Sequence, residues 1–302
     1  DLLDQQKGRF VRLPDGAGPF PAIVCRTPYS NNDRIGLQRF VDAGYGIVAQ
    51  DCRGRFKSPG RFYPFRETQD SLDTLAWVRA QPWCDGRIGM TGASYCAYTQ
   101  WAVAGRYPAG LRAITPRVMG RDLFRDLIYQ DGVFNLALAV SWGFGMAGLP
   151  VKDISPADLT KLFHHLPVNT LDEAAGGPVP FYREWLAHST RDAYWDEFAI
   201  ESRYPDINIP ALHMGGWYDL YADGVLRNFV GLRERGGSLS RARQKLIMGP
   251  WTHGLNTRVL GPLDYGEQAL VDLNEIEMRW LDRWVRDIPN GIEDEPPVKI
   301  FV

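Results

Sequence analysis

The sequence predicts an α/β fold, in which helices cover both faces of a mostly parallel sheet. Two observations support this prediction. Short apolar runs alternate with segments of helical spacing, and the same alternation resumes after a single interruption. Such alternation is typical of buried parallel strands joined by helical crossovers. The chain has 302 residues, 45% of them hydrophobic, which is enough to enclose such a sheet in a sizeable core.

The first half of the pattern lies between residues 20 and 115, and it predicts four strands and three helices. Each expected strand is a short apolar run that ends at a polar turn: 21–25, 46–50, 87–91 and 111–115. Each expected helix has apolar residues on one broad face: 36–43, 67–80 and 95–107. The first 18 residues are polar and predict no element.

The alternation stops near residue 121, which indicates an insertion. The segments 123–149 and 156–163 have helical spacing, and 181–198 is rich in aromatic residues. We therefore expect a helical cap over residues 121–205. The sheet pattern then returns with these expected elements: strands 211–214 and 245–248, helices 221–235 and 267–286, and a strand that begins at 297.

The overall composition excludes several functional classes. A net charge of −2 leaves no basic surplus to meet phosphates, so we expect no nucleic-acid partner. No apolar run approaches the roughly 20 residues of a membrane helix, so we expect no membrane partner. The four cysteines fit neither a zinc site nor a disulfide framework. Free thiols favour a cytoplasmic location, although a mature secreted form stays open.

Ser94 is the candidate nucleophile. It stands in Gly92-Ala93-Ser94-Tyr95, between an expected strand and an expected helix. A serine on such a sharp turn presents its hydroxyl to a cleft and directs backbone N–H groups to the same place. Cys96 occupies the position of the second glycine in the strict pattern, and cysteine is small enough for the turn. The alternative interpretation is an ordinary serine at a helix N-cap.

His253 and Asp219 complete a candidate triad. Each directly follows an expected strand, which puts a histidine near the C-terminus on a loop and a carboxylate 34 residues before it. The histidine is the candidate base, and the carboxylate would fix its tautomer and stabilise the imidazolium. The order Ser, Asp, His is that of α/β-hydrolases. The alternative for Asp219 is a helix N-cap, a role compatible with catalysis.

An acyl-transfer site also needs hydrogen-bond donors for the oxyanion. The N–H of Tyr95, directly after the nucleophile, is the expected first donor. The second donor normally comes from the loop after an early strand, where the polar candidate is the hydroxyl of Tyr29. From the residues alone, a core tyrosine at position 29 is an equal alternative.

Six short motifs are spread along residues 20 to 285: Arg26-Thr27-Pro28-Tyr29, Asp51-x-Arg53-Gly54 with Ser58-x-Gly60, Trp83-Cys84-Asp85-Gly86, Gly92-x-Ser94-Tyr95, Gly216-Trp217-Tyr218-Asp219 and Gly249-Pro250-Trp251-x-His253. In this order they resemble the cocaine-esterase family of hydrolases, which also includes α-amino acid ester hydrolases, glutaryl-cephalosporin acylases and the X-Pro dipeptidyl peptidases (S15 family). Ala97 stands where the family usually has glycine, and the first 18 residues do not resemble the family's opening strands.

The resemblance implies roles for individual residues. Ser94 would be the nucleophile, His253 the base and Asp219 its orienting carboxylate, while the Tyr29 hydroxyl and the Tyr95 N–H would form the oxyanion hole. Two aromatic residues would line the acyl pocket: Trp142 in the cap and Tyr221 beside the acid.

The resemblance also implies an α/β-hydrolase fold followed by a C-terminal jelly-roll, which we expect to be missing here. We therefore divide the chain into four parts: a first part of the α/β-hydrolase core (1–120), the cap (121–205), a second part of the core (206–290) and the start of a truncated or missing C-terminal β domain (291–302).

The expected function is that of a serine hydrolase that cleaves a carboxylic ester, or an amide, through an acyl-enzyme. An acyltransferase or amide acylase on the same site and a non-catalytic binding protein with the same fold are the alternatives. The expected partner is a small-molecule ester or amide substrate, and a homo-oligomer stays open. The mechanism requires no metal and no cofactor.

Overall fold

The computed structural model describes residues 8–31, 35–151 and 153–302. The chain divides into two compact units. The first unit combines the residues up to Arg121 with Ile200–Val302, and the second unit is Asp122–Ala199. The second unit is thus an insertion in the sequence of the first.

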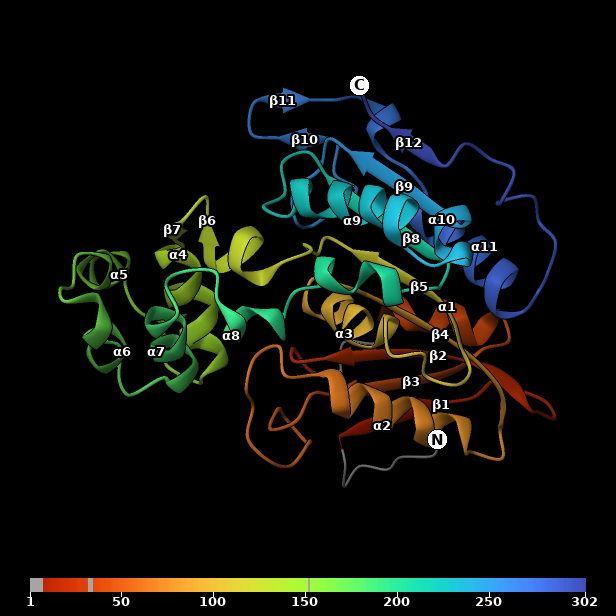
Figure 1. Ribbon diagram of the computed structural model, residues 1–302, viewed down its shortest axis with the longest axis horizontal. Helices are drawn as coiled ribbons and strands as arrows, with labels where there is room; N and C mark the ends of the chain where they lie inside the picture. Colours follow the sequence, from red (N-terminus) through yellow and green to blue (C-terminus); the bar gives the residue numbers. More distant parts are fainter. Residues whose placement is uncertain (1–7, 32–34, 152) are drawn as a thin grey trace. The chain divides into compact units, whose positions relative to one another are not determined.

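A single sheet forms the centre of the first unit (Figure 1). In the described part of the chain it has eight strands in the order β1-β3-β2-β4-β5-β8-β9-β12. All neighbours pair in parallel except β1 and β3, which are antiparallel. The strands are β1 (Arg9–Arg12), β2 (Phe20–Thr27), β3 (Gly46–Asp51), β4 (Cys84–Ala93), β5 (Leu111–Arg117), β8 (Ala211–Gly216), β9 (Gln244–Gly249) and β12 (Val298–Ile300).

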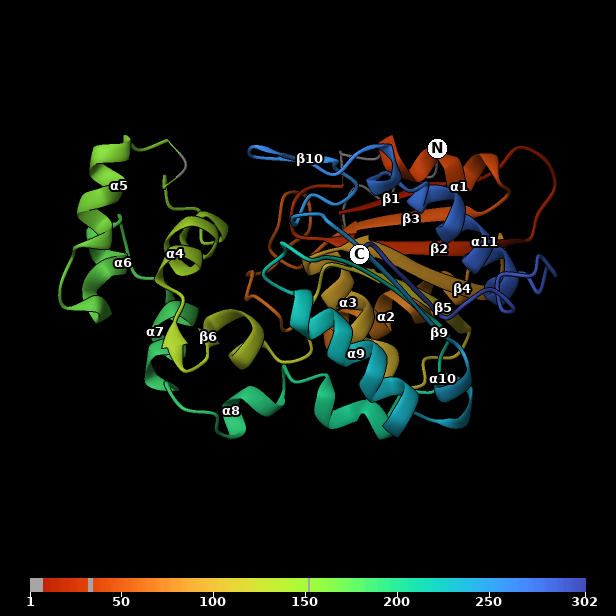
Figure 2. The same cartoon turned by 90° about the horizontal axis from the view of Figure 1, so that it is seen from above.

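Helices cover both faces of this sheet, with α1 and α11 on one face and α2, α3 and α9 on the other (Figure 2). The helices of the first unit are α1 (Gln38–Asp42), α2 (Thr68–Arg79), α3 (Tyr95–Ala104), α9 (Ala222–Arg235), α10 (Ser238–Ala242) and α11 (Leu273–Val285). Short 3₁₀ turns (Ile35–Leu37, Glu201–Asp206, Glu267–Ala269) and a hairpin of β10 (Val259–Leu260) and β11 (Leu263–Asp264) complete it. The predicted α/β-hydrolase fold with a mostly parallel central sheet is confirmed.

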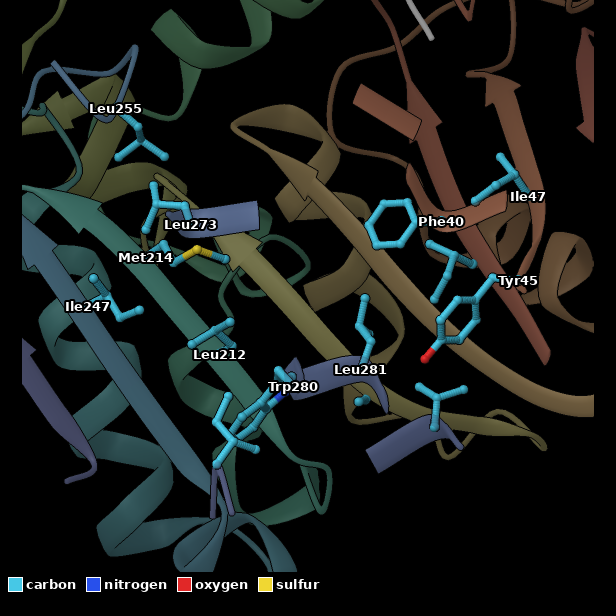
Figure 3. Packing of buried hydrophobic residues seen from close by; sticks show 14 of the residues in the cluster. Phe40, Tyr45, Ile47, Leu212, Met214, Ile247, Leu255, Leu273, Trp280 and Leu281 are labelled. Carbon is cyan, nitrogen blue, oxygen red and sulfur yellow. The ribbon is translucent and has the colours of Figure 1, made fainter. Parts of the chain in front are cut away.

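The core between the sheet and α11 explains why this helix begins and packs where it does. Its N-cap is Asp272, whose carboxylate accepts a hydrogen bond from the N–H of Glu275 at 2.9 Å. One face of the helix buries Leu281 and Val285 in the core beside the sheet. Figure 3 shows Leu281 and other members of this cluster. Burying a side chain of this size contributes about 1.5–3 kcal/mol. Because Asp272 is the cap, the helix starts six residues later than the expected range 267–286.

The second unit is mostly helical, but its start differs from the predicted helix over 123–149. The Asp131-Gly132 pair, with φ of 50° and 81°, turns the chain between two short strands. A pair with positive φ at both residues is the usual turn of a tight hairpin. The elements are π-helical segments (Phe124–Ile128, Ala139–Phe144), β6 (Tyr129–Gln130), β7 (Val133–Phe134), α4 (Leu136–Leu138), α5 (Pro156–Phe163), a 3₁₀ turn (Val168–Thr170), α6 (Leu171–Ala174), α7 (Pro180–Ala187) and α8 (Ala193–Asp196).

The two edge strands of the sheet, β1 and β12, come from opposite ends of the described chain, and β12 is the strand that the sequence predicted to begin at residue 297. Strand β1 lies within the first 18 residues, for which the sequence predicted no element, and it pairs with β3. Strand β12 lies in the part assigned to a further β domain (291–302), yet it pairs in parallel with β9 of the central sheet. Both strands cover backbone groups that would otherwise be left at an open sheet edge.

All four cysteines are described and all four are free thiols. Among the described residues, no helix combines the length and the apolar character that crossing a membrane requires.

Candidate active site

The turn between β4 and α3 holds Ser94 in a strained backbone conformation. Its φ of 57° and ψ of −124° are rarely adopted by a residue with a side chain. Its hydroxyl makes no capping bond to α3, so the N-cap alternative does not describe this serine. Gly92 has a φ of 139°, and a Cβ there would lie 2.4 Å from the Cβ of Cys96. The turn therefore requires glycine at position 92 and accommodates cysteine at 96.

Tyr95, the first residue of α3, is held firmly by its side chain. Its hydroxyl donates to Glu67 Oε1 at 2.8 Å and accepts from the N–H of Phe65 at 2.7 Å. Its ring stacks on that of Phe65 at 5.0 Å, and burial raises the pKa of its hydroxyl well above the usual value. An α-helix directs its first amides outward from its N-terminus, so this anchoring also fixes the backbone N–H beside Ser94.

Asp219 and His253 are joined by a hydrogen bond. The distance between Asp219 Oδ1 and His253 Nδ1 is 2.8 Å. The carboxylate is fully buried, whereas the imidazole is 41% exposed. The second carboxylate oxygen, Oδ2, is buried and accepts no hydrogen bond from the described residues. The ring of Tyr221 lies 5.8 Å from that of His253, so this predicted pocket residue packs beside the candidate base.

The strand order brings these loops to one edge of the sheet. Ser94 follows β4, Asp219 follows β8 and His253 follows β9, and the carboxyl ends of parallel strands meet at a common edge. Backbone bonds link the loops across that edge: Ser94 N donates to Arg117 O at 2.9 Å, and Tyr218 N donates to Trp251 O at 3.0 Å. Within the described residues no hydrogen bond joins Ser94 to His253.

The other two predicted site residues lie in different environments. Tyr29 follows β2 at the same sheet edge, its side chain is 44% exposed, and its N–H donates to Thr27 Oγ1 at 3.0 Å. Trp142 is half-buried in the segment Ala139–Phe144 of the second unit. Its role in an acyl pocket stays a prediction.

Directly below the edge lies an ion cluster that the sequence did not reveal. Glu277 of α11 is fully buried and forms ion pairs with both Arg39 and Arg117. It also accepts hydrogen bonds from the hydroxyls of Thr91 and Thr115, both at 2.6 Å. Burial raises the pKa of this carboxyl, but the two guanidinium groups and the two hydroxyls outweigh it, so the pKa lies below the usual value. The two arginine partners of Glu277 lie 160 and 238 residues away from it in the chain, so no short motif in the sequence marks this cluster.

A cavity of about 390 Å³ opens at this edge. Its walls come from the ends of β2 and β4 and from the segment before α1. They include these residues: Tyr29, Arg39, Gly92, Ala93, Cys96 and Arg117. In the described part of the chain no group of three or more His, Cys, Asp or Glu residues could hold a metal ion.

Comparison with known proteins identifies relatives of this chain. The model of the family described as X-Pro dipeptidyl-peptidase (S15 family) matches residues 10–255. Cocaine esterase of Rhodococcus sp. (strain MB1 Bresler) is 29% identical over 320 residues, which cover 96% of this chain and 54% of that protein. The chain thus spans about half the length of the curated relatives it matches.

Two solved structures share the fold. An aminopeptidase from the marine sediment archaeon Thaumarchaeota archaeon has a TM-score of 0.80 and 22% identity over 97% of this chain and 54% of that one. An α-amino acid ester hydrolase has a TM-score of 0.80 and 22% identity over 100% of this chain and 58% of that one. Both confirm the α/β-hydrolase architecture.

Proposed function

The chain belongs to the X-Pro dipeptidyl-peptidase family (S15 family), and from this premise we propose that it is a serine hydrolase that cleaves carboxylic esters through an acyl-enzyme. The observation that carries the proposal is the hydrogen bond between the buried Asp219 and the half-exposed His253, at the sheet edge that also holds the strained Ser94 turn. Esters are the class to test first because the relative with 29% identity is named an esterase. Matched amides are the second class.

In this mechanism His253 takes the proton of Ser94 as the hydroxyl attacks the ester carbonyl. Asp219 engages Nδ1 of the imidazole, which leaves Nε2 as the atom that accepts the proton. The buried carboxylate stabilises the imidazolium that forms. The same Nε2 then protonates the leaving alcohol, and water repeats the sequence on the acyl-enzyme to release the acid.

The oxyanion of the tetrahedral intermediate would be stabilised by the Tyr95 N–H and the Tyr29 hydroxyl. Tyr95 is suited to this role because Glu67 and Phe65 fix its side chain, so the amide needs no reorganisation during the reaction. Each donor of this kind contributes about 3 kcal/mol to transition-state stabilisation. Tyr221, whose ring lies beside that of His253, would offer an apolar ring surface to the acyl group.

A fluorophosphonate probe, together with hydrolysis of p-nitrophenyl esters, tests this proposal. We expect stoichiometric labelling of the wild-type protein at Ser94 and measurable ester turnover. The variant Ser94→Ala, which keeps the fold, should lose both. Labelling at another residue, or equal turnover by Ser94→Ala, would contradict the proposed nucleophile.

A further inference from the structure

The cavity at the sheet edge lies next to the candidate nucleophile turn. Gly92 and Ala93 precede Ser94 in β4, Cys96 follows it in α3, and all three line the cavity together with Tyr29. Its volume of about 390 Å³ can hold a chain of several carbon atoms. A substrate group that enters it would therefore lie next to the turn that carries Ser94.

The charge on the described part of the cavity wall has one sign. Arg39 and Arg117 are its charged lining residues, and no aspartate or glutamate is found among its described walls. The two side chains are 25% and 17% exposed, so both are mostly buried. Arg117 also lies close to the reaction in the sheet, because its carbonyl accepts the hydrogen bond from Ser94 N.

Two guanidinium groups share a single buried carboxylate, that of Glu277. The cluster of Arg39, Arg117 and Glu277 therefore carries one surplus positive charge. The Nε atoms of both arginines are buried and donate no hydrogen bond to the described residues. Asp272 attracts Arg39 at longer range, but its carboxylate is engaged as the cap of α11. A mostly buried surplus positive charge is costly unless an anion completes it.

We propose that this cavity binds a carboxylate carried by the substrate, and that Arg39 and Arg117 bind it. Planar guanidinium groups suit carboxylates because they donate two parallel hydrogen bonds. The substrate class would then be esters or amides with a free carboxylate on the acyl part or on the alcohol or amine part. The inference deepens the proposed function and rests on it, since the cavity flanks the proposed nucleophile.

Pairs of aryl esters that differ in a single charge test the proposal. One pair has a terminal carboxylate or its primary amide on the acyl chain, and the other has the same two groups on the aryl alcohol. We expect kcat/KM to favour the carboxylate by at least about tenfold in one of the two pairs, as for loss of a charge-assisted hydrogen bond. That pair also shows which part of the substrate enters the cavity. Ratios near one in both pairs would overturn the proposal.

The matched variants are Arg39→Gln, Arg39→Lys and Arg112→Gln. Arg39→Gln removes the surplus charge but leaves Glu277 paired with Arg117, and it should abolish the preference. Arg39→Lys keeps the charge and should keep most of the preference. Arg112→Gln removes the same charge at an exposed pair with Asp287, and it should leave the ratio unchanged. Because each ratio compares two substrates on one preparation, a general loss of activity cancels.

A binding measurement separates this proposal from the proposed function. Adipate and its neutral diamide are titrated calorimetrically into Ser94→Ala and into Ser94→Ala with Arg39→Gln. We expect Ser94→Ala to bind adipate but not the diamide. The double variant, in which Arg39 is also replaced, should bind adipate at least about tenfold more weakly. This result would support the anion site even if fluorophosphonate labelling failed. Absence of adipate binding beside normal labelling would overturn the anion site and leave the hydrolase intact.

Discussion

Two buried carboxylates in this protein, Asp219 and Glu277, have opposite degrees of hydrogen bonding. Both side chains are fully buried. Glu277 uses both oxygens, since Oε1 accepts from Thr91 and Thr115 and Oε2 pairs with Arg39 and Arg117. Asp219 uses one oxygen for His253, and its Oδ2 has no partner among the described residues.

This difference indicates which carboxylate serves the scaffold and which serves a reaction. A buried carboxylate whose acceptor sites are all occupied is held in place by its partners. It has no free acceptor site with which to stabilise a positive charge that forms during a reaction. Glu277 ties α11 to α1 and to the adjacent strands β4 and β5, so it supports the turn that carries Ser94. Asp219 keeps spare acceptor capacity beside a half-exposed imidazole, where an imidazolium would form.

The largest expected effect comes from the variant Asp219→Asn. An amide in place of the carboxylate holds the wrong tautomer of His253, so we expect kcat to fall about 10⁴-fold. The free energy of unfolding should change by less than about 1 kcal/mol because a single hydrogen bond is affected. Ester kinetics measure kcat, and urea unfolding of the same variant measures the free energy of unfolding. A large loss of stability with little loss of turnover would place Asp219 in the scaffold.

The variant Glu277→Gln tests the other half of the comparison. It leaves two buried guanidinium groups without their counter-charge, so we expect the free energy of unfolding to fall by about 3–5 kcal/mol. Urea unfolding measures this directly. Arg112→Gln, at an exposed ion pair, is the control and should change stability by no more than about 1 kcal/mol. Equal stability of Glu277→Gln and wild type would show that the cluster does not support the scaffold.

The variant Tyr29→Phe removes a hydroxyl at the sheet edge that holds Ser94 and leaves both carboxylates unchanged. Loss of one oxyanion donor should lower kcat about 10²- to 10³-fold, with the midpoint of urea unfolding almost unchanged. Single-turnover acylation with a p-nitrophenyl ester measures the effect on the step in which the oxyanion first forms. An unchanged acylation rate would remove Tyr29 from the oxyanion hole.

The smallest expected effect is a pH dependence of stability that comes from another buried group, His213. Burial lowers the pKa of His213 to about 4, from about 6.5 in the unfolded chain. Since the unfolded chain binds the proton first, stability is complete above pH 6.5 and falls as the pH drops to 4, by on the order of 3 kcal/mol.

Urea midpoints between pH 4 and 7 measure this slope. The variant His213→Phe should lose this slope. It should be less stable than the wild type at pH 7, because Gln244 Oε1 loses its hydrogen-bonding partner, and the difference should vanish or reverse towards pH 4, where only the wild type is destabilised by protonation of the unfolded chain. Glu277, whose pKa lies below the usual value, should lose its stabilising effect only below about pH 4.5, as the folded carboxyl becomes protonated. An identical slope in His213→Phe would assign the pH dependence to other groups.

Much of the core could be predicted because its signals are local in the sequence. The apolar runs that became β2, β3, β4 and β8, and the spacing that became α2 and α9, follow from short-range periodicity. The Ser94 turn was predicted for the same reason, since a glycine, a serine and a strand-to-helix change lie within a few residues. The Asp131-Gly132 hairpin had an equally local signal, but the helical spacing around it concealed the turn.

The sequence by itself determined the strands β2, β3, β4, β5, β8 and β9, the helices between them and the candidate residues Ser94, Asp219 and His253, because each is marked by its immediate neighbours. Only the tertiary structure decided that Asp219 bonds His253, that β1 and β12 pair with β3 and β9 as the edge strands of the sheet, and that Arg39 and Arg117 share Glu277. These contacts join residues 34 to 238 positions apart. Their geometry depends on how the sheet packs against its helices, and no short stretch of sequence records that packing.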